Sequence, residues 1–220
     1  MTTIQLATDS ISSGELADVL SGVQYFVPLV KPNVSVTTAP TPGAEVVHIT
    51  EQKRKVGASG YHIMVNGVPT AFVSPAASGG YARLWGHYTP ALWTRGVKVL
   101  GKQVVAPRLI HGEIFTPGLI TVVCHEIAEL LADGNVTTYT APDSKGRAWL
   151  LEPADWVFGT YFVKTMNTIP RVFPNVALDA FHTLGAPGPY DLCNVVKAPF
   201  QLTPKGYAYW ESPTGLIPVS

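Results

Sequence analysis

The pattern of apolar and polar positions predicts a helix near the start of the chain. Between residues 14 and 27 the apolar side chains recur with helical spacing, which places most of them on one face. Ser12 or Ser13 is the expected N-terminal cap. Pro28 is expected to end the helix, because proline lacks the N–H that continues the hydrogen-bond pattern.

Alternation of apolar and polar residues predicts strands in several later stretches, the first at 34–37 and 45–49. Asn66-Gly67 separates two more strand-like runs, and this pair favours the tight turn of a β-hairpin. The stretch 79–115 mixes Gly and aromatic residues with short strand-like runs, which predicts an excursion rich in hairpins. Further strand-like pieces lie at 136–140, 147–152, 156–163 and 169–173, and the tail at about 187–220 is expected to be extended.

A second helix is predicted over residues 117–132, where Thr116 can cap the first turn and Gly134 suits the end. Apolar side chains occupy most of the circumference of this segment. A helix that is apolar nearly all round is usually buried, so we expect this one to lie inside the fold.

The composition agrees with this outline. The chain has 220 residues, 46% of them hydrophobic, and its 20 Gly and 19 Pro favour many turns over a helix bundle. These figures predict a single α+β domain over residues 1–220, with few helices packed on a mixed or antiparallel sheet that has many hairpins.

Charge and targeting signals narrow the expected partners and location. Lys and Arg number 15 and balance 15 Asp and Glu, which gives no case for nucleic acid or an anionic membrane as a partner. The first 13 residues lack the basic and apolar regions of a signal peptide. No apolar run reaches the ~20 residues that span a bilayer. We therefore expect a chain that is made in the cytoplasm and leaves it only inside a particle or by lysis.

The second predicted helix carries the main chemical feature of the sequence, an H-E-x-x-E run at 125–129. At about 100° per residue, Glu129, Asp133 and Glu126 lie ~40°, ~80° and ~100° from His125 around the helix. These four ionisable side chains therefore share one arc of a helix that has no Lys or Arg. Buried acids and an imidazole are unfavourable unless they are paired or bind a cation, which predicts a divalent metal.

The spacing of the run suggests a role for each side chain. His125 and Glu129 are one helical turn apart and can bind the same ion, whereas Glu126 can act as general base on a bound water. The usual motif has His at the second ligand position, and a carboxylate there makes the ligand set richer in oxygen. Zinc is the expected metal, with calcium and manganese as alternatives.

The third ligand must come from outside the helix, because a helix supplies two. Asp155 is the expected third ligand, Glu152 is its alternative, and Asp133 can orient a ligand from behind. Nothing in the local sequence fixes the remaining histidines that we considered, which are His62, His87, His111 and His182. The competing interpretation is an ordinary solvated helix face, against which the apolar remainder of the helix argues.

The same helix resembles a family of uncharacterised bacteriophage proteins with an H-E-x-x-E-x-x-x-D helix, matched here at 125–133. Further matches are E-x-x-D at 152–155, G-Y-H at 60–62, G-x-P at 67–69 and a P-F … G-Y block at 199–207. Together they cover the chain from about residue 15 to 210, although the family usually has Pro where this chain has Gly134. The helix is also similar to zincin-like proteins with S-H-E-x-x-E-x-x-T-D-P, for which a peptidase role has been suspected.

The resemblance implies a zincin-like, metallopeptidase-derived fold in a virion-associated protein of phage origin. We therefore expect a metal site that serves assembly, with other virion proteins or further copies of the chain as partners. The expected location is the host cytoplasm and then the virion. The alternative is an active metallopeptidase that acts on phage or host-surface proteins, with Glu126 as base and with His125, Glu129 and Asp155 as ligands.

Overall fold

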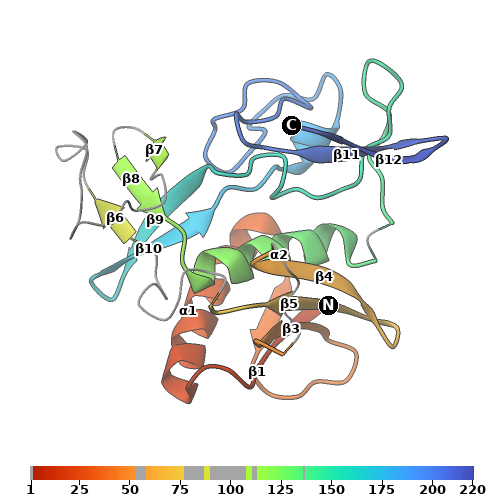
Figure 1. The fold of residues 1–220 in the computed structure, drawn as a ribbon. Helices are drawn as coiled ribbons and strands as arrows, with labels where there is room; N and C mark the ends of the chain where they lie inside the picture. Colours follow the sequence, from red (N-terminus) through yellow and green to blue (C-terminus); the bar gives the residue numbers. More distant parts are fainter. Residues whose placement is uncertain (1, 53–57, 77–86, 90–107, 111–112, 136) are drawn as a thin grey trace.

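The computed structural model describes residues 2–52, 58–76, 87–89, 108–110, 113–135 and 137–220 of the chain. Within these ranges a five-stranded mixed sheet forms one layer, and its strands come from the first third of the sequence (Figure 1). The strands are β1 (Thr2–Thr8), β2 (Val34–Thr37), β3 (Glu45–Ile49), β4 (Gly60–Val65) and β5 (Val68–Val73). Their order is β2-β1-β3-β5-β4, with β4 antiparallel to β5 at one edge and the other neighbours parallel.

The later described segments form antiparallel pairs and loops. A three-stranded sheet contains β6 (His87–Thr89), β7 (Arg108–Ile110) and β8 (Glu113–Thr116). Two hairpins follow, formed by β9 (Tyr161–Met166) with β10 (Ile169–Pro174) and by β11 (Ala208–Ser212) with β12 (Gly215–Val219). A short 3-10 helix, η3 (Asp179–His182), lies between these hairpins in the sequence.

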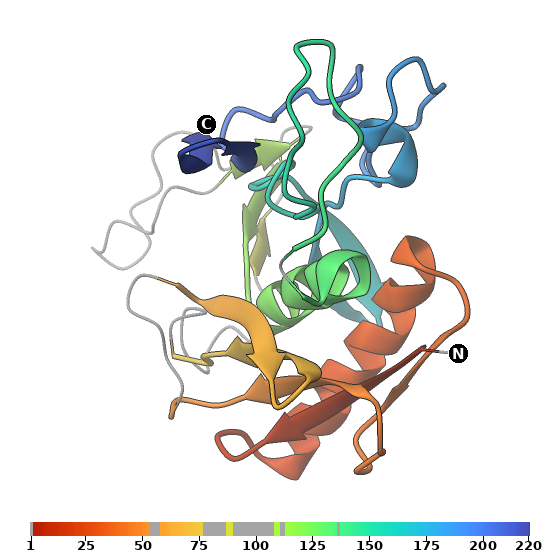
Figure 2. The ribbon, with the colours of Figure 1, turned by 90° about the vertical axis from the view of Figure 1, so that its right-hand side faces the viewer.

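Two α-helices, α1 (Ser13–Val30) and α2 (Leu119–Asp133), occur in the described residues, and they pack against each other. Figures 1 and 2 show α2 between the five-stranded sheet and the C-terminal segments of the chain. The main core joins fully buried side chains of the sheet, of α1 and of the inner face of α2, among them Val47, Phe26 and Ile127. The position of α2 between two layers explains why its sequence is apolar nearly all round.

The fold confirms the predicted α+β class with few helices and a mixed sheet. The hairpin prediction is confirmed too, since β4 and β5 pair antiparallel across Asn66 and Gly67, which both adopt positive φ angles of 50° and 79°. The predicted excursion at 79–115 lies mostly outside the described residues, and its described parts form β6, β7 and most of β8.

Both predicted helices are present, but their ends differ from the prediction. Ser12 caps α1 as expected, yet Pro28 does not end the helix, which continues to Val30. The carbonyl of Gln24, which loses its partner at Pro28, belongs to an exposed residue, so water can satisfy it. The cap of α2 is Gly118, while Thr116 ends β8.

A hydroxyl inside α2 fixes the beginning of that helix. Thr121 accepts a hydrogen bond of 3.0 Å from the N–H of Gly118, and its own hydroxyl donates one of 2.8 Å to the carbonyl of Val172 on β10. The bond to β10 ties the beginning of the helix to the second layer. Gly134 follows the last turn, as predicted.

Several strand predictions need correction. Strand β1 was not predicted, because Ile4 and Leu6 are the only large apolar residues in an otherwise polar segment. The strand pairs on both sides and buries both residues completely. The described residues of the stretches 136–140 and 147–152 are joined by an isolated bridge between Tyr139 and Leu150 and form no full strands. The tail contains the β11–β12 hairpin.

Among the described residues, neither α-helix combines the length and the apolar character that crossing a membrane requires.

Candidate metal centre

The acidic residues of α2 are buried, as the sequence predicted. Glu126 and Glu129 are each 4% exposed, and Asp133 is 2% exposed. The alternative of an ordinary solvated helix face is therefore wrong. His125 keeps slightly more exposure, with 15% of its side chain accessible, so one side of the cluster reaches toward solvent.

Three of the predicted ligands converge. His125 Nε2 lies 3.0 Å from Glu129 Oε1 and 3.2 Å from Asp155 Oδ1. Despite these short distances, neither carboxylate oxygen has a hydrogen-bond partner. Two atoms that bind one tetrahedral zinc ion at ~2.0–2.1 Å lie about 3.3 Å apart. The three side chains therefore have the spacing of ligands around one ion, and they form a group that could hold a metal.

The loop that follows α2 brings Asp155 to this position. Successive turns bond the N–H of Asp155 to the carbonyl of Glu152 and the N–H of Phe158 to the carbonyl of Asp155. The N–H of Tyr207 bonds at 3.0 Å to the same carbonyl, and the Tyr207 side chain lowers the pKa of the Asp155 carboxylate, against the larger effect of burial. A residue from the C-terminal segment thus helps to orient the expected third ligand without being a ligand itself.

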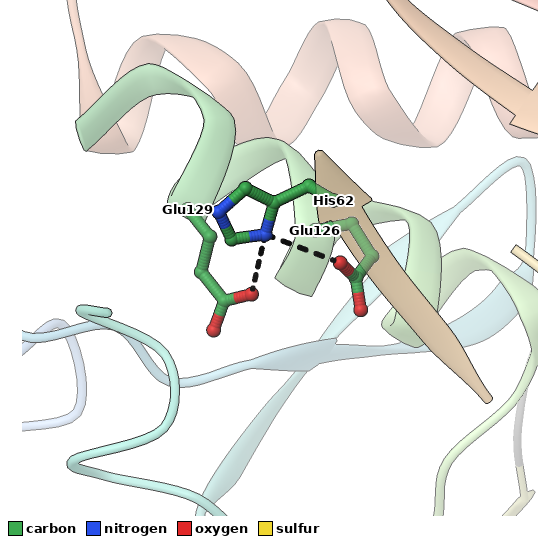
Figure 3. Close-up of side chains that lie close together, drawn as sticks. All are labelled: His62, Glu126 and Glu129. Carbon is green, nitrogen blue, oxygen red and sulfur yellow. Dashed lines mark ion pairs between the residues drawn. The ribbon is translucent and has the colours of Figure 1, made fainter. Parts of the chain in front are cut away.

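His62 is the residue of the site that sequence reasoning undervalued. It lies on the edge strand β4, is 8% exposed, and places Nδ1 3.6 Å from Glu129 Oε2 and 3.8 Å from Glu126 Oε2 (Figure 3). Its Nε2 lies 3.7 Å from Glu152 Oε1. His62, Glu126 and Glu129 form a second group that could hold a metal. The only sequence signal for His62 was the G-Y-H match of the resemblance.

The other candidates do not belong to either ligand group. Asp133 accepts hydrogen bonds from the N–H groups of Thr137 and Thr138, at 3.1 and 2.9 Å, so its carboxylate organises the loop after α2. Neither candidate ligand group in the described chain includes Asp133 or Glu152. His182 packs among aromatic rings, and burial lowers its pKa to about 4. The side chain of His87 and the whole of His111 lie outside the described part of the structure.

Burial and mutual repulsion perturb the cluster strongly in the metal-free protein. Burial raises the pKa values of Glu126, Glu152 and Asp155, and the charge of Glu129 adds to each. Burial also opposes ionisation of Glu129, but the two histidines outweigh it and lower its pKa. For His62, burial favours the neutral form, yet the surrounding carboxylates raise its pKa to about 11.

A cavity of about 530 Å³ opens onto both groups. Its lining comes from the edge strand, from α2 and from the C-terminal segments, and it includes Gly60, Tyr61, Thr121, Phe158 and Tyr207. His125, Glu126, Glu129 and Asp155 also line it, so a molecule in the cavity would contact the candidate ligands directly. A cavity of this size holds a small ligand or a few residues of a peptide.

Comparisons with protein-family models, with curated proteins and with solved structures find no match for this chain. The kinship to phage proteins, the zincin-like character of the fold and the virion location therefore stay predictions from the sequence.

Proposed function

We propose that the protein is a metal-dependent hydrolase, in which His125, Glu129 and Asp155 bind a divalent ion and Glu126 is the general base. The observation that carries this proposal is the convergence of three ligand atoms, two of them carboxylate oxygens without hydrogen-bond partners, at the wall of an open cavity. Zinc fits the ligand spacing, and the oxygen-rich set also suits manganese.

Each side chain has a distinct task in this proposal. A divalent ion supplies Lewis acidity, which polarises a substrate carbonyl and acidifies a bound water. Glu126 neighbours the ligands on α2, and burial raises its pKa toward the range in which a carboxylate accepts and returns protons. Tyr207 helps to position Asp155 through its backbone N–H, which bonds to the Asp155 carbonyl, and its residue also lines the cavity.

The edge strand favours a peptide as substrate. Residues 58–62 line the cavity, and among the described strands β4 pairs only with β5. An extended peptide can add to such a sheet edge through main-chain hydrogen bonds, which would lay its backbone along the cavity. The assembly role implied by the phage resemblance needs no cavity beside the ligands, so we favour the peptidase alternative.

The test compares hydrolysis by the wild type and by Glu126→Gln. Zinc-loaded wild type should cleave members of a quenched fluorescent peptide library, and chelation should stop it. Glu126→Gln should bind the first zinc ion yet lose at least ~10²-fold in rate, whereas Glu211→Gln on the exposed face of β11 should behave as wild type. Equal activity in Glu126→Gln and wild type would refute the proposal. Zinc binding without any hydrolysis would favour the assembly role.

A further inference from the structure

We infer that the cavity holds a second cation site, formed by His62, Glu126 and Glu129, which shares Glu129 with the first site and occupies the base Glu126. This inference rests on the proposed function, because it assigns a regulatory role to the same cluster. The second site would bind a transition-metal dication such as zinc or manganese, and its occupancy would switch hydrolysis off.

The geometry of Glu129 favours a bridge between two ions. One carboxylate oxygen, Oε1, faces His125 at 3.0 Å, while the other, Oε2, faces His62 at 3.6 Å. The two histidines come from different elements, α2 and β4, and approach the same carboxylate from separate directions. A carboxylate can bind one ion through each oxygen, so two sites can share Glu129 without competing for an atom.

An unsatisfied oxygen points into the second site. Glu126 is 4% exposed, and its Oε2 has no hydrogen-bond partner. This oxygen faces His62 Nδ1 at 3.8 Å, which is too long for a hydrogen bond, and Figure 3 shows the two carboxylates on either side of that nitrogen. All three ligand atoms lie within 4.8 Å of one another. Ligands bound to one ion at ~2.0–2.4 Å are separated by up to about 4.8 Å, so the group can surround an ion.

Charge balance supports two ions rather than one. Glu126, Glu129, Glu152 and Asp155 are all buried, and no Lys or Arg forms an ion pair with them among the described residues. When both histidines are neutral, as metal ligands must be, the three ligand carboxylates carry three negative charges, and Glu152 brings the total to four once it ionises. One dication leaves half of this charge uncompensated in a buried site, whereas two dications neutralise it.

Occupancy of the second site has a defined consequence for the proposed reaction. A Glu126 carboxylate that binds an ion through Oε2 has its charge neutralised and is a weaker proton acceptor. Hydrolysis should therefore rise as the first site fills and fall as the second one fills. The rising and falling phases depend on different residues, since His125 and Asp155 belong to the first site and His62 to the second.

Calorimetric titration of the metal-free full-length chain with zinc tests the inference directly. Wild type should bind two ions, His62→Asn should bind one, and His48→Asn on β3, which β5 separates from β4, should still bind two. Hydrolysis by wild type should fall at least tenfold between one and two equivalents, and His62→Asn should lose this inhibition. One ion in both wild type and His62→Asn overturns the second site but leaves the proposed function intact. No ion in wild type overturns both.

If His62→Asn fails to fold, electron paramagnetic resonance of Mn²⁺ bound to the wild type tests the second site instead. Two Mn²⁺ ions bridged by Glu129 in wild type should give the broadened spectrum of a spin-coupled pair at two equivalents. A spectrum of isolated Mn²⁺ at saturating manganese would contradict a shared carboxylate. In that case His62 would be an imidazolium that pairs with the neighbouring carboxylates and binds no metal ion.

Discussion

Gly60 lies directly against the carboxylate of Glu126, and a Cβ at position 60 would overlap the Glu126 side chain. The contact joins the edge strand β4 to α2, next to the cavity. Glycine at this position leaves the room that the buried carboxylate occupies. The orientation of the proposed base therefore depends on an element that is distant in sequence.

Gly60→Ala should displace the Glu126 carboxylate and leave the first set of ligands in place. A misplacement of about 1 Å in a catalytic group lowers the rate by roughly 10²-fold, so we expect a loss of this size in kcat with little change in zinc affinity at the first site. Gly14→Ala is the control, because the nearest atom to its added Cβ is the Ser12 Oγ at 4.0 Å. A Gly60→Ala protein with wild-type kcat would show that Glu126 needs no such room.

Zinc should stabilise the folded protein through Asp155. At a zinc concentration of about 100 times Kd, linkage contributes ~2.7 kcal/mol, which corresponds to a rise in Tm of roughly 5–10 °C for a chain of this size. Asp155→Asn keeps the shape of the side chain but weakens a ligand, so its zinc-induced rise should be less than half of that in wild type. Differential scanning fluorimetry with and without zinc measures both, and an undiminished rise in Asp155→Asn would remove Asp155 from the ligand set.

Stability of the metal-free protein should fall as the pH rises from about 5 to 9. Burial, with the charge of Glu129, raises the pKa values of Glu152 and Asp155, so the folded state keeps protons that the unfolded chain loses in this range. The raised pKa of His62, about 11, acts in the same direction, because its stabilising effect is complete below its unfolded pKa and disappears toward pH 11. The lowered pKa of Glu129 matters only in acid.

The stabilisation by zinc should increase with pH, opposite to the stability of the metal-free protein, because the ligands must lose their protons to bind the ion. The zinc-induced rise in Tm should therefore grow steadily across the same pH range. Melting curves at about pH 5.5, 7 and 8.5, recorded with and without zinc, provide the measurement. A zinc effect that stays constant or shrinks with pH would mean that the buried carboxylates and histidines are not the ligands.

Asp191 should be a major contributor to stability outside the site. It is 1% exposed and accepts hydrogen bonds from the side chain of Asn175 and from the N–H groups of Cys193, Val195 and Val196. Asp191→Ala leaves the N–H groups of Val195 and Val196 without this acceptor, while the Cys193 N–H keeps its bond to Asn175 Oδ1. We therefore expect ~3–5 kcal/mol of lost unfolding free energy in urea denaturation. The exposed Asp179 is the control, and Asp179→Ala should change stability by less than about 0.5 kcal/mol. Equal effects of the two substitutions would contradict this role.

The part of the site that could be predicted from sequence is the part that one helix contains. His125, Glu126 and Glu129 owe their relative positions to helical geometry, and the apolar remainder of α2 indicates burial, so local rules were sufficient. Asp155 could be proposed because it follows α2 after one hairpin-like connection, at 134–154. The contact that ties the beginning of α2 to the second layer could not be predicted in the same way, because Thr121 bonds to β10, which lies about fifty residues further along the chain.

The sequence could not single out His62 among the histidines as a candidate ligand, because its position near α2 depends on how the strands of the sheet pair. Its proximity to Glu129 requires β4 to pair antiparallel at the edge of the sheet and α2 to cross that edge. Alternation along β4 predicts only that every second side chain points to one face, and it does not say which layer covers that face. The interior strand β1 was missed for a related reason, since its burial comes from neighbours on both sides rather than from its own composition.

The most direct test of a metal centre at His125, Glu129 and Asp155 is anomalous diffraction at the zinc absorption edge from crystals of the zinc-loaded protein. The geometry predicts an anomalous peak within ~2.0–2.2 Å of His125 Nε2, Glu129 Oε1 and Asp155 Oδ1. Crystals that contain stoichiometric zinc but have no anomalous peak among these three atoms would contradict the proposed site.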